Sequence, residues 1–349
     1  MTYRIVQWTT GNVGKRSVRA VAFNPQFELV GCYAWAKDKV GKDVGVLCGI
    51  EPLGVQATDD VEALLALRPD CVVYNPMFAD VEVMIRILRA GINIVSSSEF
   101  ITGHYLGEHR DRIAKACEQG ASTIFGSGIN PGVIQLLAIV SAGLSERVEK
   151  VSVVEAIDTT IYDSPATERP MGFGYPIDQP DLKDITTKGS GIFRDGVLLI
   201  ADALGVELDD IRCDVEYAQT TEDLHLPGSW TIAKGCVAGV DVGWKGIIDG
   251  REVIEIRGRW RKGQTLQPDW ELDMGYTIEV QGTPTIKTTL NFLPPTGFVG
   301  ETLDDYITMG LSIVAVPVVT AIPAVVAAPP GIATYTNLPL LLPRGVVAT

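Results

Sequence analysis

Two glycines near the start of the chain are spaced as if to hold a phosphate group. Gly11 and Gly14 have the spacing of the second and third glycines of a dinucleotide-binding G-x-G-x-x-G motif, and Thr9 stands where the first would be. In that motif the missing side chains let the backbone approach a pyrophosphate, which binds the first N–H groups and positive dipole end of a helix. The spacing predicts a phosphate-binding turn made of Thr10, Gly11, Asn12, Val13 and Gly14.

The surroundings of this turn support the prediction. Ile5 to Trp8 is a short apolar run typical of a buried parallel strand, and from Lys15 the spacing becomes helical, with Val18 and Val21 on one face. A strand, a glycine turn and a helix in that order are what dinucleotide binding requires. The alternative is an ordinary turn without a ligand, because two glycines in a turn are common.

The end of the second predicted strand indicates which dinucleotide would bind. That strand, 28–35, leads to Ala36, Lys37 and Lys39, about 20 residues after the glycine turn, where such domains contact the adenosine ribose. An acidic residue there would accept the ribose 2′-hydroxyl and favour NAD(H), whereas lysines match a 2′-phosphate. We therefore predict NADP(H), bound by Lys37 and Lys39, with NAD(H) as the alternative. For any single lysine, a solvated turn is an equally good interpretation.

Glu99 is the carboxylate best placed for proton transfer. It follows the predicted strand 93–96 and the serines at its end, and it precedes Phe100 and Ile101. An apolar, half-buried setting would make a glutamate a usable proton donor and acceptor near neutral pH. The alternative is a carboxylate that caps backbone N–H groups at a helix start.

These residues require a scaffold that brings the ends of several strands together. Strand and helix patterns alternate about five times over the first third of the chain. This alternation predicts an α/β fold with an N-terminal Rossmann-type, doubly wound parallel sheet and helices on both faces. Asn75, Glu99 and Asn130 each follow a predicted strand, so they fall on the carboxyl edge, where such sheets bind ligands.

Two local predictions concern the same domain. The glycine-rich stretch 41–58 is predicted to be a flexible loop. A helix is predicted over 105–119, with Gly120 as its C-terminal cap.

A second domain is predicted from a change in pattern after Glu149. Long β-rich segments follow, with one predicted helix over 190–204, which indicates an α+β domain built on a large, mostly antiparallel sheet. We predict a NAD(P)-binding domain over 1–135, a substrate and dimerisation domain over 136–308, and a C-terminal segment, 309–349, that returns to the first domain.

The loop at the start of the second domain is rich in proline, glycine and aromatic residues. It carries Tyr162 and Phe173, which are predicted to roof a substrate pocket. Ordinary packing between the domains is the alternative for these side chains.

Composition and charge limit the class of protein. A chain of 349 residues suits two domains, and 46% hydrophobic with 21% charged residues excludes disorder. The net charge of −14 argues against a broad nucleic-acid or anionic-membrane surface.

The apolar stretch 311–328 is about long enough to span a membrane, but Pro317 and Pro323 interrupt it, so a buried helix packed against the first domain is predicted. Six cysteines without a C-x-x-C pair, and no leader before the first strand, predict a cytoplasmic protein with reduced thiols.

Several kinds of chemistry lack their motifs. The three histidines form neither H-x-x-x-H nor H-E-x-x-H, so no metal site is predicted. There is no G-x-S-x-G elbow, and the glycine turn lacks the G-K-[ST] ending that phosphoryl transfer uses. The remaining expectation is redox chemistry with a nicotinamide cofactor.

Four segments carry a resemblance to a known family. They are the turn 10–14, the tip Ser96-Ser97-Ser98-Glu99, the loop Gly128-Ile129-Asn130-Pro131-Gly132 and the tail 321–331, which reads AIPAVVAAPPG. Together they resemble the 2,4-diaminopentanoate dehydrogenase family and its relatives, the native amine dehydrogenases. This resemblance implies the dihydrodipicolinate reductase fold, although the H-H-x-x-K motif of that reductase has no counterpart in the chain.

The resemblance implies a reaction and assigns residues to it. The reaction is NAD(P)H-dependent reductive amination of a small ketone or aldehyde with ammonia, together with the reverse oxidative deamination, in a homodimer. Glu99 matches the family's catalytic acid/base, which would take a proton from the ammonium or attacking amine, return it to the carbinolamine hydroxyl and stabilise the iminium. Asn75, Ser97, Gly128 and Asn130 would line the nicotinamide half of the cofactor.

Two other functions fit the same residues. One is an NADP-dependent reductase of a C=N or C=C substrate without ammonia, and the other is a non-catalytic NADP-binding sensor. The aromatic loop favours a small apolar substrate. No partner for the second amine or the carboxylate of a diaminopentanoate can be identified from the sequence.

Overall fold

The computed structural model describes residues 2–162, 164–227, 230–300 and 302–347. The chain divides into two compact units, of which the first combines Met1–Val133 with Thr308–Thr349 and the second is Ile134–Ile307.

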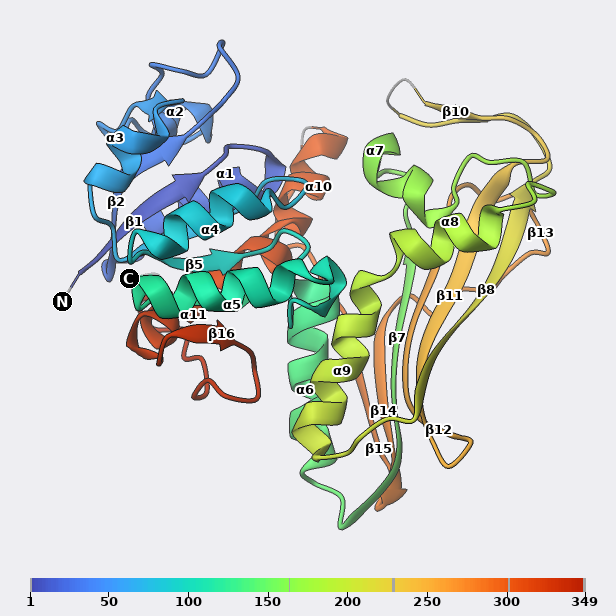
Figure 1. Cartoon of the computed structure of the whole chain (residues 1–349). Helices are drawn as coiled ribbons and strands as arrows, with labels where there is room; N and C mark the ends of the chain where they lie inside the picture. Colours follow the sequence, from blue (N-terminus) through green and yellow to red (C-terminus); the bar gives the residue numbers. More distant parts are fainter. Residues whose placement is uncertain (1, 163, 228–229, 301, 348–349) are drawn as a thin grey trace. The chain divides into compact units, whose positions relative to one another are not determined.

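The first unit is built on a parallel sheet. Its strands pair in the order β16-β6-β5-β4-β1-β2-β3, and every pair is parallel (Figure 1). The strands are β1 (Tyr3–Trp8), β2 (Phe27–Tyr33), β3 (Ala57–Thr58), β4 (Cys71–Tyr74), β5 (Asn93–Ser96), β6 (Thr123–Gly126) and β16 (Gly331–Ala333). The predicted Rossmann-type sheet is therefore confirmed, and the short strands β3 and β16 extend it at its two edges.

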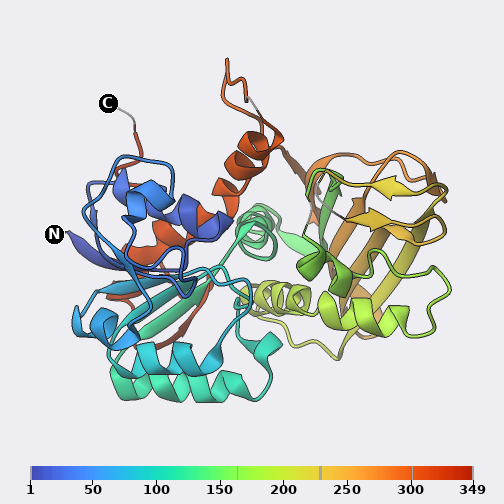
Figure 2. The ribbon, with the colours of Figure 1, turned by 90° about the horizontal axis from the view of Figure 1, so that it is seen from above.

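Helices cover both faces of this sheet because each has one apolar side. One apolar cluster joins α3, α4 and α5 to one face, and another joins α1 and α11 to the opposite face, as Figure 2 shows from above. In α4, for example, Met84, Ile87 and Leu88 are fully buried. The helices are α1 (Asn12–Ala22), α2 (Val44–Leu47), α3 (Val61–Ala66), α4 (Val81–Arg89), α5 (His109–Gly120) and α11 (Ser312–Ala327).

Helix α11 belongs to the core of the first unit. The stretch Asp305–Ala327 is long and apolar enough to cross a membrane, and among the described residues it is alone in this. However, Ala321, Ile322 and Val325 are fully buried in the cluster formed with β-strand residues of the parallel sheet. Because these side chains fill the sheet's own core, the prediction of a buried helix that returns to the first domain is confirmed.

The stretch 41–58 is folded, and the prediction of a flexible loop was wrong. It contains α2 and ends in β3. The carboxylate of Asp43 organises it by accepting hydrogen bonds from the backbone N–H groups of Gly45, Val46, Leu53 and Gly54. Burial acts against ionisation of Asp43, but these hydrogen bonds outweigh it and lower the pKa of the carboxyl group.

The ends of α5 also differ from the prediction. Residues His104–Leu106 form a separate 3-10 turn, so α5 begins at His109. The left-handed residue at its C-terminal end is Ala121, with φ 49°, and not Gly120. Gly120 is required for packing instead, because a Cβ there would lie 1.8 Å from the carbonyl oxygen of Leu88.

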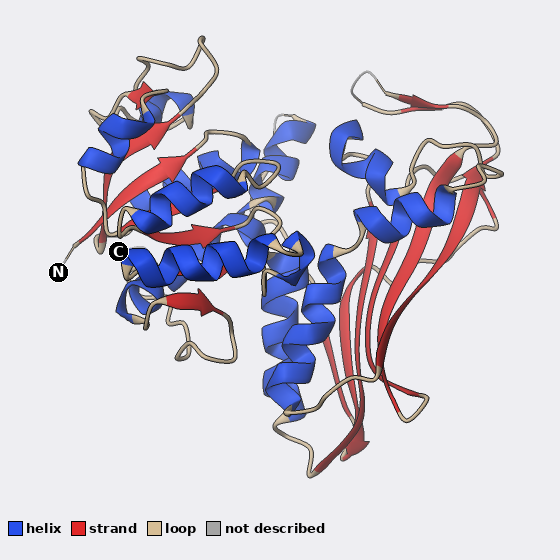
Figure 3. Ribbon diagram, in the orientation of Figure 1, coloured by secondary structure: helices blue, strands red, loops and turns tan. Residues whose placement is uncertain are grey.

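The second unit is built on a large sheet, seen as long strands in Figure 3. The sheet is mixed, and only β12 and β7 pair in parallel in it. The strand order is β13-β8-β11-β12-β7-β14-β15, and the predicted large, mostly antiparallel sheet is confirmed. The strands are β7 (Arg147–Asp158), β8 (Asp210–Thr220), β11 (Val237–Ile248), β12 (Arg251–Arg261), β13 (Leu266–Gln267), β14 (Gly275–Thr283) and β15 (Ile286–Leu290), with a separate pair β9 (Leu224–His225) and β10 (Thr231–Ile232).

Helices pack on one face of the second sheet. The indole of Trp244 on β11, for instance, donates to the hydroxyl of Ser190 between two of them, at 3.0 Å. Helix α9 confirms the helix predicted over 190–204, and α8 precedes it in a stretch that the sequence analysis did not assign to a helix. The helices of this region are α6 (Ile134–Ala142), α7 (Pro165–Glu168), α8 (Leu182–Gly189) and α9 (Ile192–Leu204), and α10 (Leu303–Gly310) follows β15 at the junction of the two units.

Candidate functional site

The glycine turn joins β1 to α1, and Thr9, which stands in place of the motif's first glycine, takes up a backbone conformation that favours glycine. Thr9 adopts φ 75°, in the left-handed region that favours glycine. Two hydrogen bonds hold it there: its N–H donates to the carbonyl of Tyr33 at 2.9 Å, and its hydroxyl donates to the carbonyl of Asn75 at 3.1 Å. A threonine therefore holds the left-handed conformation at the position of the motif's first glycine, with residues at the ends of β2 and β4 supplying the stabilisation.

The two predicted glycines serve different purposes. A Cβ on Gly14 would lie 2.3 Å from the carbonyl oxygen of Thr9, so Gly14 is needed for close packing of helix on strand. A Cβ on Gly11 would meet nothing within 4 Å. Gly11 borders open space at the N-terminus of α1, and the hydroxyl of Thr10 beside it is buried with no hydrogen-bond partner among the described residues. A free donor, open space and a helix N-terminus fit a pyrophosphate.

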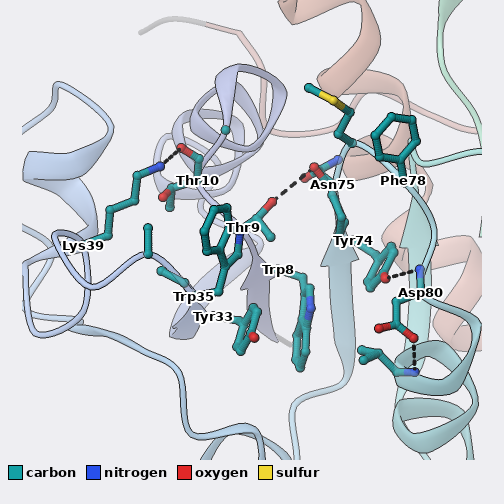
Figure 4. Close-up of a pocket in the computed structure, with 16 residues that line it drawn as sticks. Trp8, Thr9, Thr10, Tyr33, Trp35, Lys39, Tyr74, Asn75, Phe78 and Asp80 are labelled. Atoms are coloured by element: carbon teal, nitrogen blue, oxygen red, sulfur yellow. Dashed lines mark hydrogen bonds between the residues drawn. The ribbon is translucent and has the colours of Figure 1, made fainter. Parts of the chain in front are cut away.

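A cavity of about 380 Å³ opens beside this turn (Figure 4). The loops after β1, β2 and β4 form its walls. Of the predicted cofactor-binding residues it contains Thr10, Gly11, Lys39 and Asn75. Its lining is Trp8, Thr9, Thr10, Gly11, Tyr33, Ala34, Trp35, Ala36, Lys39, Tyr74, Asn75, Pro76, Met77, Phe78, Asp80 and Val83.

Aromatic residues that the sequence analysis did not assign to the site line much of this cavity. Trp8 stacks on Tyr33 with ring centroids 4.5 Å apart, and Tyr74 lies on its other side at 6.3 Å. Trp35 is 73% exposed and Phe78 is 54% exposed, although both line the cavity. Large exposed aromatic side chains at a cavity mouth are suited to covering a flat apolar group such as an adenine ring.

Tyr74 contributes a neutral phenol to the cavity. Its oxygen accepts a hydrogen bond from the N–H of Asp80 at 3.0 Å. Burial raises the pKa of Tyr74 to about 12, and the negative charges of Asp80 and Glu99 act in the same direction. Asp80 itself is occupied as the N-cap of α4, where it accepts from the N–H groups of Glu82 and Val83.

Of the two lysines predicted to bind a 2′-phosphate, only Lys39 lines the cavity. Its Nζ donates to the carbonyl of Thr10 at 3.1 Å, which places it beside the glycine turn. Among the residues that the structure describes, Lys39 has no carboxylate partner. Lys37 is exposed and lies outside the lining. The last residues of β2 and the three that follow it include no acid.

A hydrogen-bonded network joins the ends of β1, β4 and β5. The amide of Asn75 accepts from the side chain of Gln7 at 2.8 Å and donates to the hydroxyl of Ser97 at 2.8 Å. The hydroxyl of Ser98 donates to the carbonyl of Pro76 at 2.6 Å. Asn75 and Ser97, which the family resemblance implied would both line the nicotinamide half of the cofactor, are thus in direct contact.

Glu99 lies on the same edge, next to this network. It is half-buried, adopts φ 43°, and precedes the buried ring of Phe100. Its carboxylate accepts a hydrogen bond from the N–H of Ala79 at 2.9 Å. Ala79 belongs to the loop whose Met77 and Phe78 line the cavity, so Glu99 anchors that wall from behind. The alternative expected for Glu99 from the sequence is a carboxylate that caps backbone N–H groups at a helix start. The carboxylate does accept a backbone N–H, but that N–H belongs to Ala79 on the loop after β4.

The loop after β6 contains the predicted residues Gly128 and Asn130. It runs through a cis Asn130–Pro131 bond into a tight turn over Ile129–Val133, which the N–H of Val133 closes onto the carbonyl of Gly128 at 3.0 Å. This loop does not line the 380 Å³ cavity. It lies farther along the same carboxyl edge, because β6 follows β5 in the strand order.

The two predicted substrate-pocket residues lie in the second unit. Tyr162 is 38% exposed, whereas Phe173 is 2% exposed and packs inside its own unit, near the ammonium of Lys262. That ammonium is fully buried and pairs with Glu168 at 2.7 Å. Lys262 also donates to the carbonyl of Tyr162, so it fastens the loop that carries both aromatic residues. Their part in a substrate pocket stays a prediction.

The described residues form neither a metal-binding cluster nor a disulfide. Within the described ranges, no group of three or more His, Cys, Asp or Glu side chains is arranged to hold a metal ion. All six cysteines are free thiols.

Comparison with known proteins identifies the family. The model of the 2,4-diaminopentanoate dehydrogenase C-terminal domain matches residues 133–348, and that of the dihydrodipicolinate reductase N-terminus matches residues 5–125. The chain belongs to the 2,4-diaminopentanoate dehydrogenase family. Membership in this family makes the protein an oxidoreductase of the amine dehydrogenase type, and its Rossmann domain is of the kind that binds NAD(P).

Individual relatives of the family agree with this assignment. An amine dehydrogenase from Streptomyces virginiae is 30% identical over 306 residues, which cover 82% of this chain and 84% of the relative. The 2,4-diaminopentanoate dehydrogenase of Acetoanaerobium sticklandii is 28% identical over 271 residues, which cover 75% of this chain and 70% of that relative. The structure of an amine dehydrogenase from Mycobacterium smegmatis shares the fold, with a TM-score of 0.80 over 99% of this chain and 98% of that one at 19% identity.

Proposed function

We propose that the protein is an NADP(H)-dependent amine dehydrogenase that aminates a small ketone or aldehyde with ammonia and catalyses the reverse deamination. Membership in the 2,4-diaminopentanoate dehydrogenase family supports the reaction class. The observation that carries the proposal is the position of Glu99, a half-buried carboxylate on the edge of the sheet that also holds the open glycine turn. A homodimer and a cytoplasmic location stay predictions from the family resemblance and the sequence.

Glu99 is proposed to move the protons of the reaction. When bound, the reduced nicotinamide would supply a hydride to the substrate carbon. The Glu99 carboxylate takes a proton from ammonium, so that ammonia attacks the carbonyl, and a proton moves from the nitrogen to the oxygen to give the carbinolamine. The carboxylic acid then gives its proton to the carbinolamine hydroxyl, which leaves as water. The regenerated carboxylate stabilises the positive charge of the iminium. Each proton removed is thereby returned within one turnover.

The other residues are proposed to hold the cofactor. The open space at Gly11 and the free hydroxyl of Thr10 support pyrophosphate binding, and the aromatic cavity supports adenine binding. Asn75, Ser97, Gly128 and Asn130 are proposed to line the nicotinamide half, farther along the same edge.

The direct test is NADPH consumption by the purified protein with a panel of small ketones and aldehydes, with and without ammonium. We expect oxidation of NADPH only when both a carbonyl compound and ammonium are present. Turnover that does not need ammonium would instead identify a reductase of C=N or C=C substrates. Tight NADPH binding without turnover of any carbonyl compound or amine in the panel would indicate a sensor.

Lys39→Ala is expected to weaken NADPH binding by about 10- to 100-fold while NADH affinity changes little, because a charge-assisted hydrogen bond to the 2′-phosphate is lost. Isothermal titration with each dinucleotide measures both affinities. Lys37→Ala is the matched control: this lysine is exposed and outside the cavity, so a smaller effect is expected. Tighter binding of NADH than of NADPH by the unmodified protein would contradict the preference.

A further inference from the structure

The C-terminal segment of the chain is attached along the strand β6. Strand β16 pairs with β6 in parallel, and the N–H of Gly331 donates to the carbonyl of Ser122 at 3.0 Å. The hydroxyl of Thr123 donates to the carbonyl of Pro329 at 2.9 Å. These bonds hold the C-terminal segment alongside β6, so that it continues toward the carboxyl end of β6, where the loop with Gly128 and Asn130 begins.

Tyr335 follows β16 and reaches that loop. Its hydroxyl is hydrogen-bonded to the hydroxyl of Ser127 at 2.6 Å. Its ring lies edge-on against the fully buried ring of Phe125, with centroids 5.1 Å apart and planes at 89°. Burial raises the pKa of Tyr335 to about 12, so the phenol is neutral under physiological conditions. A neutral hydroxyl, held by a packed ring, points at Ser127.

Ser127 is the residue around which the loop turns. Its N–H donates to the carbonyl of Ser96 at 2.9 Å, and its hydroxyl contacts the carbonyl of Gly128 at 3.3 Å. A Cβ on Gly132 would lie 2.8 Å from that same hydroxyl oxygen, so the end of the loop also packs on it. The position of one hydroxyl group therefore sets where both ends of the loop 128–132 lie.

We propose that Tyr335 is a positioning residue for the cofactor site, and that it holds the loop 128–132 against the nicotinamide half through Ser127. The inference rests on the proposed function, because that function places Gly128 and Asn130 beside the nicotinamide. It makes the C-terminal segment part of the machinery of the N-terminal domain. The 380 Å³ cavity, which is proposed to hold the adenine, is formed by the loops after β1, β2 and β4. Neither Tyr335 nor Ser127 lines that cavity.

The test compares two ligands on the Tyr335→Phe variant, which keeps the ring against Phe125 and removes only the hydroxyl. Isothermal titration measures the affinity for NADPH and for adenosine 2′,5′-bisphosphate, which lacks the nicotinamide half. Because one hydrogen bond is lost, we expect NADPH affinity to fall by about 3- to 10-fold and the bisphosphate affinity to stay unchanged. Ser127→Ala should show the same split, and the double variant should be no weaker than either single one.

The controls separate this role from simple packing. Tyr217→Phe removes a partly buried tyrosine hydroxyl that donates to the Leu182 carbonyl and the Thr186 hydroxyl in the second unit, and it should bind both ligands as the unmodified protein does. Unchanged NADPH affinity in Tyr335→Phe and Ser127→Ala would overturn the inference, as would an equal loss for both ligands. An unmodified protein that binds neither ligand would refute the proposed function itself, which is a different result.

Discussion

Replacing Glu99 with glutamine is expected to lower kcat for ammonium-dependent reduction by about 10²- to 10⁴-fold, the usual contribution of a general acid/base. The reason is that an amide at this position neither accepts a proton from ammonium nor returns one to the carbinolamine. Glutamine keeps the shape of the side chain, and its oxygen can still accept the N–H of Ala79, now bonded at 2.9 Å. The loop that lines the cavity should stay in place, so NADPH affinity should change by less than about threefold.

The measurement is steady-state turnover with a ketone and ammonium, alongside NADPH titration and thermal unfolding of the same preparation. Glu118→Gln is the matched control, because it removes an exposed carboxylate of α5 away from the carboxyl edge. Activity within tenfold of the unmodified enzyme in Glu99→Gln would show that another group carries the proton. A second variant, Glu99→Ala, should lose NADPH affinity as well as turnover, since the hydrogen bond to Ala79 is gone.

Alanine in place of Gly11 is expected to weaken NADPH binding on the order of 100-fold while the stability of the protein hardly changes. A Cβ at this position meets no protein atom within 4 Å, so the fold accommodates it. The same methyl group would project into the space that a pyrophosphate needs in order to reach the first N–H groups of α1. NADPH titration and the unfolding midpoint measure the two effects separately.

Gly14→Ala is the comparison, because it is expected to lower the stability of the protein, which Gly11→Ala should leave almost unchanged. Its Cβ would lie 2.3 Å from the carbonyl oxygen of Thr9, so strand and helix must move apart, and we expect a loss of stability of about 1–3 kcal/mol or more. A Gly11→Ala protein that binds NADPH as tightly as the original would refute the assignment of this turn as the phosphate site. Equal destabilisation by both substitutions would show that Gly11, too, is only a packing residue.

The periodicity of the sequence was enough to predict the layered architecture of the first unit. Strands such as β4 and β5 are short apolar runs, which indicates strands buried inside the sheet. Helices such as α4 have apolar residues at helical spacing, which indicates one face packed against the sheet. The edge strands β3 and β16 escaped prediction because two or three residues have no period. The stretch around Asp43 escaped for another reason: a single carboxylate orders it through backbone N–H groups as far on as Leu53 and Gly54, and no periodic pattern marks these bonds.

The candidate site was predicted less completely than the fold. Gly11, Asn75 and Ser97 could be found because each stands shortly after a predicted strand, and Gly14, in the first turn of α1, because its spacing from Gly11 matches the dinucleotide-binding motif. The aromatic lining of the cavity was missed, since Trp8 and the residues near it look like ordinary apolar strand ends. The signal available was their position: Trp8, Tyr33 and Tyr74 each end a strand, and these strands are neighbours in the sheet.

The sequence by itself determined the order of the longer strands and helices, the glycine turn and the family, because these depend on residue types at short and regular spacing. The tertiary structure decided which side chains meet. Only strand order brings Lys39 to the glycine turn while Lys37 stays in solvent, lets Asn75 stabilise the left-handed Thr9, and carries Tyr335 to Ser127 across more than half of the chain. Such contacts depend on distances between segments remote in sequence, and no local pattern of residues records those distances.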